Sequence, residues 1–159
     1  MMLLFKILLS LLVLFLVAVL LVGFLRTWQI SSMPYQQTFL KGSVPNPEPE
    51  GFYAGTTAFS TPWIGKKFDA ASGMGVNIIK NSAGEQIEKY PFKTYFSNGL
   101  IDRDLQVLKI DYNIPENPFW VRWILDEIVQ TAPGQYFGKM HLRLIPGFPF
   151  SILYFQLNK

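Results

Sequence analysis

The hydrophobic positions of the chain form one long uninterrupted run, which is followed by short alternating segments. From Ile7 to Leu25 nineteen residues carry no charge, and Lys6 and Arg26 flank them. As an α-helix this run measures about 28 Å at 1.5 Å per residue, which matches the hydrocarbon thickness of a bilayer. The run is longer than the apolar core of a signal peptide, and no Ala-x-Ala-like cleavage site follows it. The pattern predicts a single-pass transmembrane anchor over residues 1–26.

A polar stretch follows the anchor and is predicted to separate it from the rest of the chain. It covers residues 27–50, and in its last part, 45–50, proline alternates with Asn and Glu. Proline lacks the N–H group that a regular ladder needs, and proline-rich linkers are extended and semi-rigid. We therefore expect a juxtamembrane spacer that lifts one domain, residues 51–159, off the headgroups.

Residues 51–159 alternate between apolar and polar positions in short segments that glycine and proline separate. The alternation is clearest in the segment 107–114, where Leu108, Ile110 and Tyr112 share one face. We predict strands over residues 51–58, 76–79, 90–96, 100–105, 107–114, 135–145 and 150–157. Seven or eight short strands favour a mainly β fold, a small antiparallel barrel, because closure hides the strand edges.

One segment breaks the strand pattern and predicts an amphipathic helix. Asn117 is a good cap, Pro118 suits the first helical position, and the run 132–134, Ala-Pro-Gly, ends the segment. Apolar side chains between them form a broad stripe at helical spacing. We expect a helix over residues 118–131 that packs across an end or side of the barrel. A role at the membrane surface is the alternative, because Trp120 and Trp123 lie near its start.

Composition and charge exclude several classes of site. The chain has no cysteine and one histidine, so disulfides, thiolate metal sites and multi-histidine metal sites are excluded. Without Lys6 and Arg26, twelve basic residues face eleven acidic ones in the rest of the chain. The only adjacent basic pair is Lys66–Lys67. We therefore expect no nucleic-acid partner, no metal and no cofactor.

Three segments resemble the GxWxG family of small lipocalin-like proteins. The run 51–55, Gly-Phe-Tyr-Ala-Gly, is similar to the family's opening motif, with Tyr53 in place of the tryptophan. The run 63–69 resembles its aromatic–glycine–lysine–x–phenylalanine segment, and the run 152–157 resembles its closing aromatic strand. The resemblance implies a barrel and carries no activity with it. Independently of the family, the two glycines let the backbone bend while the Tyr53 ring closes one end.

The candidate ligand-binding residues combine aromatic rings with one polar strand face. Asp111 lies on the polar face of one predicted strand, and His141 and Arg143 share that of another, so that Asp111 could meet either across the ladder. If these side chains point inward, they would hold a polar head in an apolar cavity. If they point outward, they form an ordinary solvated face. The aromatic candidates are Tyr53, Trp63, Tyr112 and Tyr136.

These features favour a binding protein over an enzyme. No nucleophile elbow, phosphate loop or paired catalytic carboxylate stands out in the sequence, and haem ligation through the single histidine, His141, is a weak alternative. We expect a membrane-anchored domain, on the non-cytoplasmic side, that binds a lipid or other small hydrophobic molecule without turnover. Two alternatives stay open: an interaction protein with a filled barrel that docks a membrane partner, and an enzyme that uses the Asp111, His141 and Arg143 face.

Overall fold

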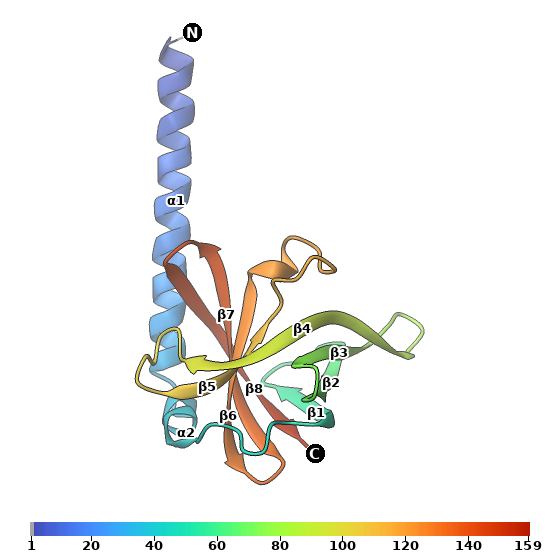
Figure 1. Cartoon of the computed structure of the whole chain (residues 1–159). Helices are drawn as coiled ribbons and strands as arrows, with labels where there is room; N and C mark the ends of the chain where they lie inside the picture. Colours follow the sequence, from blue (N-terminus) through green and yellow to red (C-terminus); the bar gives the residue numbers. More distant parts are fainter. Residues whose placement is uncertain (1) are drawn as a thin grey trace.

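The computed structural model describes residues 2–159 and shows a closed antiparallel β-barrel preceded by a long helix (Figure 1). The mainly β, barrel-shaped fold that the sequence predicts is therefore confirmed. The elements are α1 (Met2–Ser31), α2 (Tyr35–Lys41), β1 (Gly51–Thr57), β2 (Trp63–Asp69), β3 (Met74–Lys80), β4 (Gln86–Asn98), β5 (Gln106–Asp111), a single 3₁₀ turn (Val121–Trp123), β6 (Ile124–Ala132), β7 (Gln135–Ile145) and β8 (Phe148–Asn158).

Each strand of the barrel pairs with the next one along the chain, and β8 pairs with β1 to close it. This up-and-down order places alternate connections at opposite ends. The β1–β2, β3–β4, β5–β6 and β7–β8 connections lie at one end, which we call the open end. The β2–β3, β4–β5 and β6–β7 connections lie at the other, the closed end. An eight-stranded barrel is wide enough for side chains or for one small ligand.

Aromatic side chains fill the closed end of the barrel. The Tyr53 ring packs edge-on against Tyr136 and Phe68, with centroids 5.2 and 5.8 Å apart. Phe68 in turn packs against Phe92 at 5.4 Å, and all four residues are buried. Edge-to-face pairs at these separations add attraction beyond their buried area. The small Gly75 next to Phe92 makes room for this packing, because a Cβ at Gly75 would lie 2.3 Å from that ring.

The helix α1 is long and apolar enough to cross a membrane, by length and composition. Its first two-thirds project away from the barrel, and its last turns run beside β8 (Figure 1). In this contact Gly23 faces the Phe150 ring, and Phe24 packs edge-on against Phe148 and Phe150. Since Phe148 begins β8, α1 leaves the barrel at the open end.

The segment predicted as a spacer is partly helical and packs on the barrel. Residues 27–31 continue α1, and α2 follows after a short turn. Ile30 and Phe39 are fully buried from solvent in a second apolar cluster outside the barrel, with Val129, Phe137 and Tyr154 of β6, β7 and β8. The chain then returns to β1 through the proline-rich run, and Ser43 forms an isolated bridge with Gln130.

The helix predicted over residues 118–131 is wrong: this segment is one 3₁₀ turn followed by β6. Ile124, Asp126 and Ile128 point into the barrel, while Leu125 and Glu127 point outward and are buried there too. A strand with both faces buried lacks the polar side that alternation requires, and its apolar residues then mimic a helical stripe. The strand predicted over residues 100–105 is also wrong, because these residues belong to the β4–β5 connection.

The close approach at Gly75 generates a test of the closed-end packing. In the variant Gly75→Ala the new methyl group would meet the Phe92 ring and the Lys67 carbonyl oxygen, at 2.3 and 2.6 Å. Overpacking of this kind costs about 1–3 kcal/mol, so we expect the free energy of unfolding to fall by that amount. Denaturant unfolding of the full chain in detergent measures it. Ser82→Ala, in the exposed turn between β3 and β4, serves as the control and should leave stability unchanged.

Candidate functional site

A cavity of about 300 Å³ occupies the half of the barrel interior nearest the open end. Its walls are mostly apolar, and the β1–β2 and β5–β6 connections form its rim. The lining residues are Thr57, Phe59, Thr61, Pro62, Trp63, Lys66, Asn77, Ile79, Tyr90, Tyr112, Val121, Ile124, Asp126, Met140, Leu153 and Phe155. The aromatic packing at the closed end forms its floor.

A buried cluster of polar side chains lies within this apolar wall. The Lys66 Nζ atom lies 2.9 Å from Asp126 Oδ2 and donates a hydrogen bond to Asn77 Oδ1 at 3.0 Å. It also donates to the Tyr112 hydroxyl, which itself donates to Asp126 Oδ2 at 3.2 Å. Three acceptors around Nζ match the three donors of an ammonium group, which indicates an ion pair. Trp63 Nε1 completes the cluster by donating to Asn77 Oδ1 at 2.9 Å.

Aromatic rings surround the Lys66 ammonium on its remaining sides. The Nζ atom lies between 5.0 and 5.4 Å from the ring centroids of Trp63, Phe92, Tyr112 and Phe155. Ring faces attract a cation at this range, and the attraction is stronger where water is excluded. The aromatic cage and the carboxylate together hold a charge that would otherwise be costly to bury.

Burial dominates the acid–base properties of the cluster. It lowers the pKa of the Lys66 ammonium below its ordinary value, and the attraction and hydrogen bond of Asp126 oppose this change. Burial and the negative charge of Asp126 raise the pKa of the Tyr112 hydroxyl well above its ordinary value. Tyr112 therefore remains protonated and keeps the hydrogen that it donates to Asp126. The cavity offers a ligand an electrically balanced ion pair within apolar walls.

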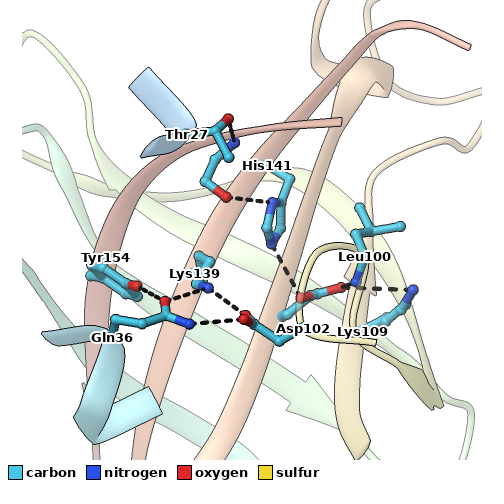
Figure 2. A network of polar contacts seen from close by, with 10 residues as sticks. Thr27, Gln36, Leu100, Asp102, Lys109, Lys139, His141 and Tyr154 are labelled. Carbon is cyan, nitrogen blue, oxygen red and sulfur yellow. Dashed lines mark hydrogen bonds and ion pairs between the residues drawn. The ribbon is translucent and has the colours of Figure 1, made fainter. Parts of the chain in front are cut away.

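A second polar network lies outside the barrel, between the helices and the sheet (Figure 2). The Lys139 Nζ atom on β7 lies 2.5 Å from Asp102 Oδ2 and donates to Gln36 Oε1 at 2.8 Å. The Gln36 amide on α2 also donates to Asp102 Oδ1 at 2.8 Å, and the Tyr154 hydroxyl on β8 donates to Gln36 Oε1. These contacts join α2, the β4–β5 connection, β7 and β8.

A neighbouring group of outer contacts reaches α1 through the single histidine. His141 Nε2 lies 3.2 Å from Glu127 Oε2, and His141 Nδ1 lies 3.2 Å from Ser151 Oγ. The Ser151 backbone N–H donates to the Thr27 hydroxyl of α1 at 3.0 Å (Figure 2). The other Glu127 oxygen, Oε1, accepts from the Leu100 N–H at 2.6 Å. A carboxylate only accepts, so Nε2 carries a hydrogen in this arrangement.

Serine, histidine and glutamate in contact resemble the residue types of a hydrolytic triad, but the geometry here is structural. Ser151, His141 and Glu127 are each 0% exposed. A nucleophile must reach its substrate, and the helix and the β4–β5 connection cover all three side chains. These contacts therefore join α1 and the β4–β5 connection to the sheet. Among residues 2–159, His, Asp and Glu also form no cluster of three that could hold a metal.

The seven candidate residues predicted from the sequence separate into two groups. Trp63 and Tyr112 line the cavity, and Tyr53 and Tyr136 lie in the aromatic packing that forms its floor. The polar candidates lie on the outer face of the barrel and are not among the cavity-lining residues. There Asp111 pairs with Arg143, and His141 belongs to the buried outer contacts. Asp111 and His141 point outward because side chains alternate along a strand and the preceding residues, Ile110 and Met140, point inward.

The charged residues of the cavity escaped the sequence analysis. Lys66 stood out only as half of a basic pair and as part of the motif at 63–69, and Asp126 lay in the segment predicted as a helix. The signal was the period of two: Lys66 is in phase with the buried Phe68, and Asp126 is in phase with Ile124 and Ile128. A charge in phase with buried apolar residues is typical of an interior polar site.

Removing the carboxylate of the cavity pair tests its energetic role. In Asp126→Ala the Lys66 charge stays buried without its partner, and we expect the free energy of unfolding to fall by about 3–5 kcal/mol. In the double variant Lys66→Met with Asp126→Leu no charge is left, so most of the loss should be recovered. Asp104→Ala, an exposed acidic position, is the matched control. Denaturant unfolding measures all three, and a double variant as unstable as Asp126→Ala would contradict this account.

The outer pair of Asp111 and Arg143 generates a second prediction. Partial burial alone would raise the pKa of Asp111. The hydrogen bond from Arg143, the Asn113 backbone hydrogen bond and the nearby positive charges outweigh the effect of burial, so the pKa is lowered overall. Arg143 Nη2 lies 2.5 Å from Asp111 Oδ1, so Arg143→Ala should reduce the free energy of unfolding at neutral pH by about 1–3 kcal/mol.

The pH dependence of that loss identifies its cause. A carboxylate with a lowered pKa in the folded state contributes stability above its unfolded pKa, and the contribution is lost as the pH falls through the folded value. The difference between the native chain and Arg143→Ala should therefore shrink as the pH falls below about 4. Arg103→Ala, an exposed arginine, is the control. A difference that stays constant down to pH 2 would show that Arg143 acts through packing.

No family model, curated protein or solved structure matches the chain. The fold alone does not identify an activity, because barrels of this kind carry many different sites. The functional conclusion therefore rests on the residues that line the cavity and on the helix that leaves the barrel beside its open end.

Proposed function

We propose that the chain is a membrane-anchored, lipocalin-like barrel that binds a lipid or other small hydrophobic molecule without turnover. The observation that carries the proposal is the interior cavity of about 300 Å³, with apolar walls and one buried polar cluster around Lys66. Ligand pockets generally combine such walls with a few polar groups that orient the ligand. The cavity also disfavours the filled-barrel alternative, because the aromatic side chains of the interior leave this volume unfilled.

The helix α1 serves as the single-pass anchor in this proposal. It runs without a break from Met2 to Ser31, and its last turns are part of the folded domain. Arg26 Nε donates to the Ile152 carbonyl oxygen at 2.9 Å, and Ile30 is 1% exposed. Cleavage within these turns would remove contacts that the barrel makes with its own chain, which supports retention of the helix. The barrel lies on the non-cytoplasmic side in the proposal.

The size of the cavity favours a ligand with one chain or one ring system. Small-molecule pockets generally measure about 300–1,000 Å³, and the cavity of about 300 Å³ lies at the lower end of that range. A whole two-chain phospholipid is larger than the cavity. We propose a single acyl, isoprenoid or small ring molecule, with its apolar part against Ile79, Met140 and Leu153.

The polar cluster favours an uncharged polar group on the ligand. Asp126 already balances the Lys66 charge, so a ligand carboxylate would bring a second negative charge beside it. A ligand hydroxyl or amide group can instead donate a hydrogen bond to the Asp126 carboxylate, which lines the cavity, without that repulsion. The Lys66 amine is engaged by three acceptors, which supports binding without covalent chemistry.

Photo-crosslinking tests the proposal in the full chain. A fatty alcohol that carries a diazirine on its chain is equilibrated with the protein in micelles and activated by light. We expect the crosslinked peptides to contain the cavity residues Trp63, Met140 or Leu153. In Leu153→Trp the larger ring fills the cavity, and the yield at these positions should fall several-fold. Leu40→Trp makes the same change at an exposed position of α2, and the crosslinking yield of this variant should equal that of the native chain.

The matching fatty acid serves as the second probe and tests the preference for an uncharged group. Near neutral pH it should label the cavity more weakly than the alcohol does, because its carboxylate meets Asp126. Labelling confined to the lipid-facing surface of α1, or labelling of the cavity that Leu153→Trp does not change, would refute the binding proposal.

A further inference from the structure

We propose that an exposed aromatic cluster on the β5–β6 connection inserts into the bilayer that α1 crosses, so that the cavity opens directly toward lipid. The cluster, which we call the aromatic tip, consists of Phe119, Trp120 and Trp123. This inference rests on the proposed anchor, but it concerns a different surface and a different partner: the membrane itself, in contact with the barrel.

The aromatic tip is one packed cluster that solvent leaves largely uncovered. Phe119, Trp120 and Trp123 are 64%, 55% and 40% exposed. Their rings contact one another edge-on, with the Phe119 centroid 5.1 Å from that of Trp120 and 5.4 Å from that of Trp123. A contiguous exposed patch of this kind marks an interaction site. Tryptophan and phenylalanine are also the residues that favour the boundary between headgroups and acyl chains.

The base of the connection holds the tip firmly. The Asn117 amide is buried and donates to the carbonyl oxygens of Pro91 and Tyr112, at 2.7 and 2.9 Å. Ile114 and Val121 are buried on either side of it. The Trp and Phe rings therefore project from a connection that is anchored to β4 and β5.

The position of α1 relative to the barrel indicates the partner. Residues 2–22 precede Gly23, which faces Phe150 of β8, and measure about 30 Å as a helix, the thickness of the hydrocarbon layer. When this part of α1 spans a bilayer, Phe24 and Phe148 lie at its surface, because the two rings are 6.1 Å apart. Phe148 begins β8 at the open end, and the β5–β6 connection belongs to the same end (Figure 1).

The same connection also borders the cavity. Val121 and Ile124, on either side of Trp123, line its rim. Phe59, 55% exposed, borders it from the β1–β2 connection. With the aromatic tip in the interface, this rim faces the acyl chains. An apolar ligand would then move between bilayer and cavity without crossing bulk water.

Spin labelling measures the depth of the aromatic tip directly. The chain contains no cysteine, so a single introduced cysteine carries the only label. Phe119→Cys and Trp120→Cys place a nitroxide on the tip, and Ser72→Cys places one at the closed end as the control. The full chain is reconstituted without added ligand into vesicles of phosphatidylcholine. For each label, the collision rate of the nitroxide with O₂, which concentrates in the bilayer, is then compared with its collision rate with a polar nickel complex in water.

We expect the ratio of O₂ to nickel collisions to be several-fold higher at 119 and 120 than at 72. Equal ratios at the three positions would overturn the inference. A low O₂-to-nickel ratio together with dipolar broadening of the label at 119 or 120 would show that the aromatic tip contacts the tip of a second copy of the chain. That result would also overturn the inference. Because no ligand is present, a failure of photo-crosslinking leaves this result unaffected. A low ratio at the tip likewise leaves cavity labelling in micelles as the separate test of binding.

Discussion

Lys139 and Glu127 lie on the outside of the barrel and yet are 0% exposed, and this burial of charge organises the rest of the molecule. A buried charge is costly unless a partner and hydrogen bonds compensate it. The sheet supplies only part of that compensation. Asp102 and the Leu100 N–H come from the β4–β5 connection, and Gln36 comes from α2. The strands, the helices and this connection therefore stabilise one another, and α1 is held along β8 as part of the same unit.

This attachment gives the barrel a defined direction relative to the apolar helix. A flexible linker would let the cavity face anywhere, whereas contacts from Gly23 to Ile30 align α1 with β8. The open end, the exposed aromatic cluster and the projecting part of α1 then lie together. Inside the barrel, Lys66 and Asp126 compensate each other's buried charge, as the outer contacts compensate Lys139 and Glu127. The inner pair permits polar groups in an apolar space while leaving that space electrically balanced.

The sequence predicted the fold better than it predicted the site, for identifiable physical reasons. Alternation along 107–114 and 135–145 gave the strands, and the uncharged run at 7–25 gave the long helix. Alternation along a strand shows which residues share a face, but it does not show which of the two faces lies inside a closed barrel. The Asp111 and Arg143 face was therefore open to both interpretations, and it lies outside.

Strands with both faces buried were harder to predict from the sequence. In β6 the outward Leu125 and Glu127 are covered by contacts from distant segments, such as the Leu100 N–H on Glu127. No local pattern contains that information, and a strand without a polar side was mistaken for a helix. The outer network was missed for the same reason, since Gln36 and Lys139 are 103 residues apart. The cavity aromatics Trp63 and Tyr112 were accessible from sequence because ring size and alternation are local properties.

The account as a whole depends on α1 and the barrel forming one rigid body in a membrane. A distance measurement by pulsed electron resonance between two nitroxides tests this most directly. One label replaces Phe15 on the exposed part of α1, and the other replaces Glu85 in the β3–β4 connection of the barrel. In nanodiscs, the buried network predicts a single narrow distribution of distances. A broad distribution, as expected of a domain on a flexible tether, would contradict the account.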